Sequence, residues 1–324
     1  MLDPAKTQTT VDAVRQGNVR ASARLITQAE SGDAAIRPVL QALYRHGGRA
    51  RVLGITGPPG AGKSTLVDQL VAHYRSRGQR VAVLAVDPSS PFSGGAVLGD
   101  RLRMGRHDTD RGVFIRSMAT RGMLGGLSKA VGDAMTVLDA MGWDLIIVET
   151  VGVGQSEMDI VRHAACIVLL QTAMGGDAVQ IAKAGVLEVG DIFVVNKAEA
   201  DGSARMVNAL NEMIGNRGDH GDAGKWQPTV LKTEATTGKG IAELAQEIER
   251  RFAFLHDHPA AARAQQTTQL RARALEIARD MLSTRIQRQI DGDAEHAQLL
   301  DDVLARRQDP YAFAQALLSL SPQE

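Results

Sequence analysis

Residues 57–64 read GPPGAGKS, which satisfies the pattern G-x-x-x-x-G-K-[ST]. They follow a β-branched run and precede a helical pattern at 65–75. Glycines here allow successive backbone amides to turn toward phosphate oxygens, at the positive end of a helix dipole. The stretch therefore predicts a phosphate-binding loop in which Lys63 contacts the β- and γ-phosphates and Ser64 ligates magnesium. The predicted nucleotide contacts are Gly57, Pro58, Pro59, Gly60, Ala61, Gly62, Lys63, Ser64 and Thr65.

Short β-branched runs alternate with helical patterns around this loop. Such alternation is typical of crossover units and predicts an α/β fold, with a mostly parallel sheet covered on both faces. Sheets of this kind bind ligands at the carboxyl ends of their strands. The predicted strands are 52–56, 81–86, 113–117, 145–149, 167–171, 192–196 and 229–233.

Helical patterns without strands flank this region on both sides. The sequence divides into an N-terminal helical segment at 1–48, a P-loop domain at 49–257 and a C-terminal helical arm at 258–324. In the arm, Leu270, Ala274, Ile277 and Met281 trace one helical face. Because the arm has little core of its own, we expect it to pack on the P-loop domain or on a second subunit.

The charge balance argues against a dedicated nucleic-acid binder. Lysine plus arginine equals aspartate plus glutamate at 37 each, so the basic excess that nucleic-acid binders use is missing. The lone cysteine, Cys166, lies in an apolar run and is expected to be a buried thiol. The first residues lack a secretory pattern and no apolar run approaches a bilayer span, so we expect a cytoplasmic protein without membrane contact.

A carboxylate follows the apolar run 145–148. Glu149 is followed by Thr150, Val151 and Gly152. A γ-phosphate sensor needs this pattern of an acid, two residues and a glycine at a strand end. The glycine amide can bond the γ-phosphate, and the loop that follows can move when that phosphate leaves. The alternative is a strand-end acid that faces solvent. We expect Glu149 to belong to the metal and catalytic site.

A second acidic strand end lies at Asp87. It opens a Pro/Ser/Gly-rich stretch that continues to Asp100, and this stretch carries few groups able to form a core. Asp87 and Asp100 are both candidates for a magnesium site, directly or through water. Each is alternatively a turn residue or a cap.

The strand at 192–196 leads into Asn196, Lys197, Ala198 and Glu199. A carboxylate at the fourth place of such a loop accepts hydrogen bonds from N1–H and N2–H2, which guanine carries and adenine lacks. We expect Asn196 to meet the guanine edge and Lys197 to lie over the ring, although a surface turn has the same composition. Amides of the later loop, 233–240, are expected to contact the base oxygen.

Several stretches resemble the MeaB/ArgK-type GTPases, a family that includes the human methylmalonic aciduria type A protein. They are 54–66, 84–104 (LAVDPSSPFSGGAVLGDRLRM), 114–128 (FIRSMATRGMLGGLS), 148–157 (VETVGVGQSE) and 176–197, which ends in DIFVVNK. The middle stretches are far more specific than the phosphate loop. The flanking helical segments are similar to the family's in a less distinctive way.

The resemblance implies a GTPase that binds GTP or GDP with Mg²⁺ and serves an adenosylcobalamin-dependent acyl-CoA mutase. It implies that GTP hydrolysis gates cobalamin loading, protection and repair of the mutase, and that the C-terminal arm joins a homodimer. Switch segments are implied at 89–103, 152–157 and 175–185. The implied metal ligands are Ser64, Asp87, Asp100 and Glu149; the implied catalytic residues are Lys63, Asp87, Asp100, Glu149 and Lys183; further nucleotide contacts are Gly152, Asn196, Lys197 and Glu199.

The sequence departs from the family pattern at two places. Glu199 stands where an aspartate is usual, and the stretch 173–180 (AMGGDAVQ) lacks a proline and an acid that relatives usually carry. The first bears on guanine selectivity. The second bears on the client, which is either methylmalonyl-CoA mutase or a relative acting on isobutyryl- or 2-hydroxyisobutyryl-CoA.

Two other functions are compatible with the phosphate loop. A small-molecule or protein kinase of the arginine/ornithine transport type needs an acceptor pocket and usually ATP. A metal-delivery GTPase needs a His- or Cys-rich tract, whereas the eight histidines here are scattered. No arginine is obviously placed to assist hydrolysis, so we predict a slow GTPase that its partner accelerates; the candidates are Arg101, Arg103, Arg116 and Arg121.

Overall fold

The computed structural model describes residues 3–87, 105–107, 109–119, 126–150, 163–172, 189–216, 224–292 and 294–319. Asp100, Gly152 and Lys183 lie outside the described residues, as does the side chain of Asp87. The chain forms two compact units, Met1–Gln269 and Leu270–Glu324. Each unit is described by itself.

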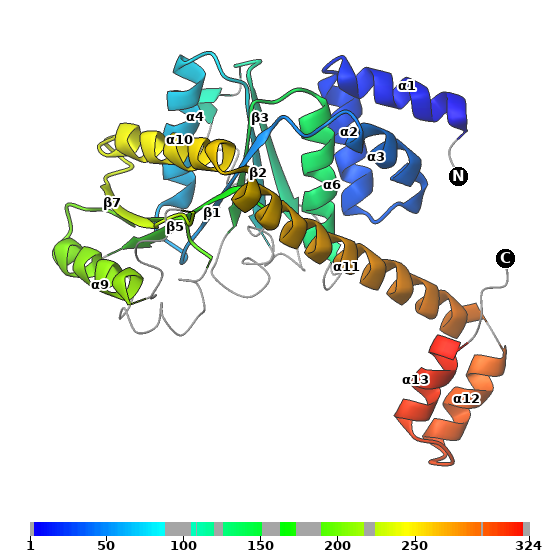
Figure 1. Ribbon diagram of the computed structural model, residues 1–324. Helices are drawn as coiled ribbons and strands as arrows, with labels where there is room; N and C mark the ends of the chain where they lie inside the picture. The colour runs from blue at the N-terminus through cyan, green and yellow to red at the C-terminus, as the bar shows by residue number, and fades with distance from the viewer. Residues whose placement is uncertain are drawn as a thin grey trace. The chain divides into compact units, whose positions relative to one another are not determined.

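The larger unit is built on a seven-stranded sheet in the order β3-β2-β4-β1-β5-β6-β7 (Figure 1). All strand pairings are parallel, as the alternating pattern predicts. Each predicted strand is present, with its ends shifted by two residues at most. The strands are β1 (Arg51–Thr56), β2 (Val81–Asp87), β3 (Val113–Ala119), β4 (Leu145–Thr150), β5 (Cys166–Thr172), β6 (Ile192–Asn196) and β7 (Thr229–Thr233).

Helices cover both faces of the sheet because successive side chains of each strand point to opposite sides. Val83 and Ile147 belong to a core with α4 and α10, whereas Leu84 and Val148 belong to a core with α6. A third cluster joins α9 to the α6 side of β5 and β6. The covering helices are α4 (Lys63–Ser76), α6 (Gly126–Ala140), α9 (Ser203–Gly215) and α10 (Ile241–Asp257).

The N-terminal helices belong to the same compact unit as the sheet. Leu25 and Val39 are fully or almost fully buried and share a core with Val131 of α6. Asp3 and Asn18 cap two of these helices, since their side chains accept backbone N–H bonds in the first turn. The elements are α1 (Pro4–Arg15), α2 (Val19–Glu30), η1 (Ala34–Ile36) and α3 (Arg37–Tyr44).

One polar contact joins α6 to the chain before β1, and a second joins α2 to β3. The Asp139 carboxylate on α6 accepts the N–H groups of Gly48, Arg49 and Ala50, just before β1 begins. Arg116 of β3 forms an ion pair with the buried Glu30 of α2. Arg116, a candidate for assisting hydrolysis, is therefore engaged with α2; the other three candidates lie outside the described residues.

Helix α11 (Pro259–Gly292) begins in the larger unit. Gln269 Nε2 donates a 2.8 Å hydrogen bond to the Ala164 carbonyl, and Gln265 Nε2 lies 3.3 Å from the Ala165 carbonyl. Both carbonyls immediately precede β5. The first turns of α11 are thus anchored at the amino ends of the strands, opposite the edge at which the phosphate loop follows β1.

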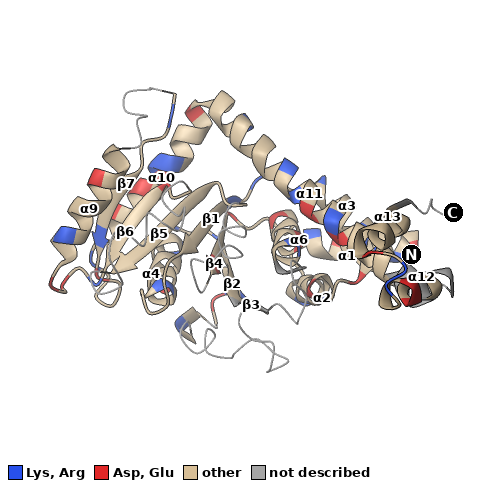
Figure 2. Cartoon of the chain, turned by 90° about the horizontal axis from the view of Figure 1, so that it is seen from below, with Lys and Arg blue, Asp and Glu red and all other residues tan. Residues whose placement is uncertain are grey.

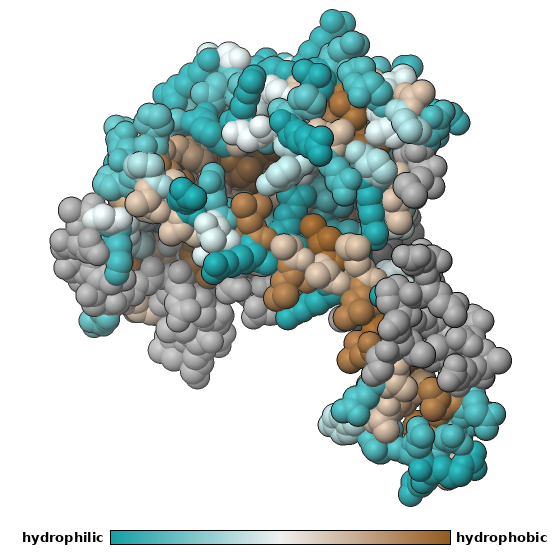
Figure 3. Space-filling view, turned by 45° about the vertical axis from the view of Figure 1, so that its right-hand side comes forward, coloured by the Kyte–Doolittle hydropathy of each residue, from teal (hydrophilic) through white to brown (hydrophobic). Residues whose placement is uncertain are grey.

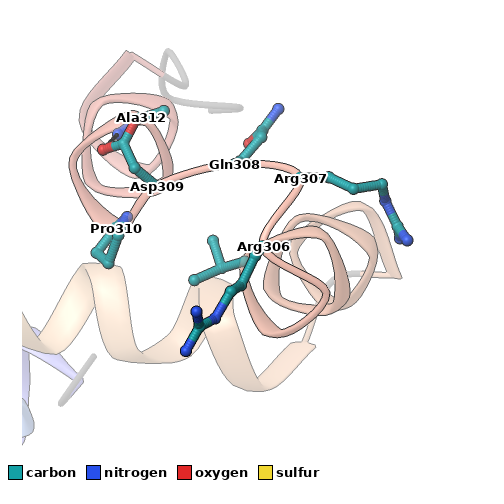
Figure 4. A pocket seen from close by; sticks show the side chains of 7 residues that line it. Arg306, Arg307, Gln308, Asp309, Pro310 and Ala312 are labelled. Atoms are coloured by element: carbon teal, nitrogen blue, oxygen red, sulfur yellow. Dashed lines mark hydrogen bonds between the residues drawn. The ribbon is translucent and has the colours of Figure 1, made fainter.

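The smaller unit contains the rest of α11, α12 (Ala294–Leu304) and α13 (Pro310–Ser319). The turn between α12 and α13 is held by an Arg307–Asp302 ion pair of 2.7 Å and by Asp309, which caps α13. A hollow of about 640 Å³ lies at this turn (Figure 4), and its lining shares no residue with the predicted nucleotide loops.

Apolar side chains remain exposed on the smaller unit, and Figure 3 shows apolar surface along its helices. This agrees with the expectation that the arm lacks a core of its own, although Leu317 is 9% exposed. Where the structure describes side chains of this unit, the exposed large apolar residues are Leu270, Leu275, Met281, Leu282, Leu300, Leu304, Tyr311 and Leu318.

Charges of both signs are interspersed over the described helices (Figure 2), in keeping with the formal net charge of zero. Among the described residues, no helix combines the length and apolar character needed to cross a membrane.

Candidate functional site

The phosphate loop connects the end of β1 at Thr56 to the start of α4 at Lys63. Gly57 has φ 153°, and a Cβ there would lie 2.5 Å from the Leu170 carbonyl oxygen. Gly62 has φ 90°, and a Cβ there would lie 2.5 Å from Asn196 Nδ2. Both positions require glycine, because neighbouring strands approach the loop too closely for a side chain.

Lys63 is 6% exposed, and its ammonium group lies over the loop. Nζ donates to the Gly57 carbonyl at 2.8 Å and to the Pro58 carbonyl at 2.9 Å. Burial lowers the pKa of Lys63, and the charge of Glu149 opposes this shift. The loop therefore carries a positive charge held at its centre, as phosphate binding requires.

Ser64 and Glu149 are in direct contact. Ser64 Oγ donates to Glu149 Oε1 at 2.7 Å, which joins the first turn of α4 to the end of β4. The strands β1 and β4 are neighbours, with Ile55 paired to Glu149, and Glu149 is 5% exposed. A hydroxyl and a carboxylate at this spacing are the oxygen ligands that a hard cation such as Mg²⁺ takes.

Asp87 lies at the same edge of the sheet as Glu149. In the pairing of β2 with β4, Ala85 is opposite Glu149 and Val86 is opposite Thr150. The backbone of Asp87 therefore follows one residue beyond Thr150 at the carboxyl ends of the strands. The structure places this backbone near the candidate metal site, while the roles of Asp87, Asp100, Gly152 and Lys183 stay predictions.

Asn196 connects the phosphate loop to the predicted base-binding loops. Its Nδ2 donates to the Ala61 carbonyl at 2.8 Å, and its Oδ1 accepts from Thr233 Oγ1 at 2.9 Å and from the Ala235 amide at 3.1 Å. Asn196 is 2% exposed. Beyond the guanine contact expected from the sequence, this side chain positions three segments relative to one another.

Thr233 is a site residue that no sequence pattern singles out, although the loop that it opens was expected to contact the base. Its hydroxyl, together with the Ala235 amide, determines which end of the Asn196 side chain faces the phosphate loop. A hydroxyl residue at the end of a strand that precedes a base-binding loop is a weak local signal. Its importance follows from the contact across β6 and β7, which the sequence does not show.

The remaining base-loop residues lie at the surface. Lys197 has φ 56° and is exposed, and Glu199 is exposed. Lys239, from the loop after β7, forms a 2.7 Å ion pair with Glu234. The pKa of Lys239 is raised, first by its hydrogen bond to Glu234 and then by the negative charges of Glu234 and Glu199. Both loops therefore bring charged groups to one solvent-accessible rim.

The family model described as "Methylmalonyl Co-A mutase-associated GTPase MeaB" matches residues 22–291. The chain belongs to this family. The resemblance found in the sequence is confirmed, and the match begins within α2 and continues through nearly all of α11. Members of the MeaB family hydrolyse GTP, so this protein is a P-loop GTPase that binds guanine nucleotides.

Relatives of known sequence agree with this assignment. A protein of Pyrococcus horikoshii is 43% identical over 309 residues, which cover 95% of this chain and 96% of the relative. The GTPase ArgK of Escherichia coli is 37% identical over 254 residues, which cover 75% of each chain. The similarity includes nearly the whole length of the first relative.

A solved structure shares this architecture. The crystal structure of a LAO/AO transport system kinase aligns with a TM-score of 0.68 at 27% sequence identity, and the alignment covers 98% of each chain. The aligned residues thus include both compact units of the chain.

Proposed function

We propose that this protein is a GTP-driven chaperone of an adenosylcobalamin-dependent acyl-CoA mutase, in which GTP hydrolysis gates cofactor loading, protection and repair. The match to the mutase-associated GTPase family over residues 22–291 carries the proposal. Hydrogen bonds connect the phosphate loop to Glu149 and to Asn196. This connected site supports the proposal that the protein binds and hydrolyses GTP.

The described residues fit a bound Mg²⁺–GTP. Lys63 and the loop amides would hold the phosphates, and Asn196, Lys197 and Glu199 would face the base. Ser64, with Glu149 beside it, would hold the metal ion, and Asp87 and Asp100 would complete the acidic cluster. Magnesium at this place would neutralise charge on the β- and γ-phosphates. Glu149 would respond to the γ-phosphate through the segment that follows it.

The client is proposed as methylmalonyl-CoA mutase or a relative acting on isobutyryl- or 2-hydroxyisobutyryl-CoA. The family description supports a mutase of this class. The stretch 173–180, which departs from the family pattern and belongs to the proposed partner-facing switch, is the reason to include the relatives.

Single-turnover GTP hydrolysis, with and without each candidate mutase, tests the proposal. We expect the protein alone to hydrolyse GTP slowly and the client mutase to raise this rate by at least about tenfold. Such an increase is modest beside the ~10³–10⁵-fold increase in rate that partner proteins give other GTPases. Lys63→Ala, which removes the phosphate contact, should abolish both rates. Hydrolysis that no adenosylcobalamin-dependent mutase alters would overturn the chaperone function and leave only the GTPase.

The smaller unit is proposed to join two copies of the chain. Leu275 and Leu282 are 55% and 46% exposed and lie seven residues apart on α11, so they share a side of the helix. Burying such residues against a second copy stabilises a dimer by roughly 25 cal/mol per Å² of apolar surface. Sedimentation analysis should give a dimer that Leu282→Glu weakens and the neighbouring Ser283→Glu does not. An unchanged mass for Leu282→Glu would exclude this surface.

A further inference from the structure

Asp68 on α4 holds a short segment of chain that precedes β3. Arg106 Nε donates to Asp68 Oδ1 at 2.9 Å, and Arg106 Nη2 lies 2.7 Å from Oδ2. The same Nη2 donates to the Asp68 carbonyl at 2.7 Å. His107 Nε2 lies 3.1 Å from Asp68 Oδ1, and the His107 side chain is 8% exposed. Two-pronged contacts of this type are strong and directional.

A second fork attaches the same segment further along α4. Arg75 Nε and Nη2 each donate to the Asp110 carboxylate at 2.8 Å. Residues 105–107 and 109–112, named here the strap, are therefore fastened to α4 at two points. The exposures of the two pairs are similar, with 45% and 14% for Arg106 and Asp68, and 23% and 33% for Arg75 and Asp110.

The two forks differ in their distance from Ser64. Asp68 follows Ser64 by four residues, which places the two side chains on one face of α4, about 6 Å apart along its axis. Arg75 follows Ser64 by eleven residues, about 16 Å along the axis. The Asp68 fork is therefore adjacent to the candidate magnesium ligand, and the Arg75 fork is remote from it.

The strap leads into β3, which lies beside β2 in the sheet. Asp87 is the last residue of β2 and is paired with Ala119 of β3. The strap begins at Gly105. Asp68 thus fixes where Arg106 and His107 lie, beside the first turns of α4.

We propose that Asp68 is a positioning residue for magnesium-dependent GTP hydrolysis. By holding Arg106 and His107 against α4, it keeps this part of the chain and the first turns of the helix in the arrangement that serves Ser64. Asp68 touches neither nucleotide nor metal in this role. The inference rests on the proposed magnesium site at Ser64 and Glu149, and deepens it.

The test is a magnesium titration of GTP hydrolysis, paired with GDP affinity measured in EDTA. In Asp68→Asn and Arg106→Gln, the magnesium concentration that gives the half-maximal rate should rise about tenfold. A change of this size is expected when one charged, two-pronged hydrogen-bonded contact is lost. GDP affinity without magnesium should stay within about twofold. Because Arg106 is half-exposed, Arg106→Gln keeps the test valid even where Asp68→Asn does not fold.

Asp110→Asn is the matched control, since it removes the equivalent fork from the same strap far from Ser64. It should leave the magnesium dependence within about twofold of the wild type. Equal shifts in Asp68→Asn and Asp110→Asn, or no shift in Asp68→Asn and Arg106→Gln, would overturn the inference. A wild-type protein without magnesium-dependent hydrolysis would instead overturn the proposed metal site itself, and this inference with it.

Discussion

The hydroxyl of Ser64 donates a 2.7 Å hydrogen bond to the carboxylate of Glu149. These residues are far apart in the chain, and they meet because β1 and β4 are adjacent parallel strands with their carboxyl ends at one edge. The contact joins the phosphate loop to the strand whose following residues include the proposed γ-phosphate sensor. Substitution of Glu149 is therefore the most direct test of the proposed metal and catalytic site.

Glu149→Gln removes the charge while keeping an oxygen that can accept the Ser64 hydrogen bond. We expect the rate of GTP hydrolysis to fall by about 10²-fold or more, as for loss of a catalytic carboxylate, with a higher magnesium requirement. Single-turnover hydrolysis measures this, and GTP affinity in EDTA should change little. A variant that hydrolyses GTP at the wild-type rate would remove Glu149 from the metal and catalytic site.

Thr233→Val removes the hydroxyl that donates to Asn196 Oδ1 without changing the size of the side chain. A lost hydrogen bond to a buried polar group costs about 1–3 kcal/mol, so GDP affinity should fall by roughly 5- to 150-fold. Fluorescent-nucleotide binding measures the change. Thr229→Val, which removes the 2.7 Å bond to Glu247 at the other end of β7, should leave affinity unaltered. Equal losses in both variants would indicate a general effect on the strand.

Gly62→Ala and Gly60→Ala separate backbone strain from collision. Both glycines have positive φ, at 90° and 75°, so alanine costs about 1–2 kcal/mol at either. Among the described residues, an added Cβ at Gly62 would lie 2.5 Å from Asn196 Nδ2, whereas a Cβ at Gly60 would meet nothing within 4 Å. GDP affinity, measured by calorimetry, should fall much further for Gly62→Ala. Similar losses would argue against the close contact with Asn196.

The Arg75–Asp110 pair should contribute a pH-dependent part of the stability. The hydrogen bond from Arg75, and then the Gly112 amide, lower the pKa of Asp110. A carboxyl with a lowered pKa in the folded state stabilises the protein above its unfolded pKa of 3.8 and loses this contribution as pH falls through the folded value. Asp110→Asn should therefore cost up to about 1 kcal/mol at pH 7, because solvent screens the pair.

Urea unfolding of the wild type and Asp110→Asn, at pH 7 and below pH 3.8, checks this dependence. The difference between the two proteins should narrow at the lower pH. A difference that is constant with pH would mean that packing, and not the charge of Asp110, sets the cost.

Much of the site was predictable from local sequence. Residues 57–64 specify a phosphate loop because a glycine pattern, a lysine and a hydroxyl act within one turn of chain. The seven strand positions and Glu149 at a strand end also follow from local patterns, since β-branched runs mark strands and parallel strands present their carboxyl ends together. The family resemblance rested on equally local stretches, and the match over residues 22–291 confirmed it.

Contacts between distant segments depended on the tertiary structure. Asn196 bonds the Ala61 carbonyl because the order β1-β5-β6-β7 brings β6 near the phosphate loop, and alternation of strands and helices does not specify that order. The forks from Asp68 and Arg75 to the strap, and the anchoring of α11 through Gln269, likewise join residues that no spacing relates. Sequence alone determined the chemistry of the phosphate loop and its family; only the folded chain decided which side chains hold that loop in position, because hydrogen bonds select partners by proximity in space.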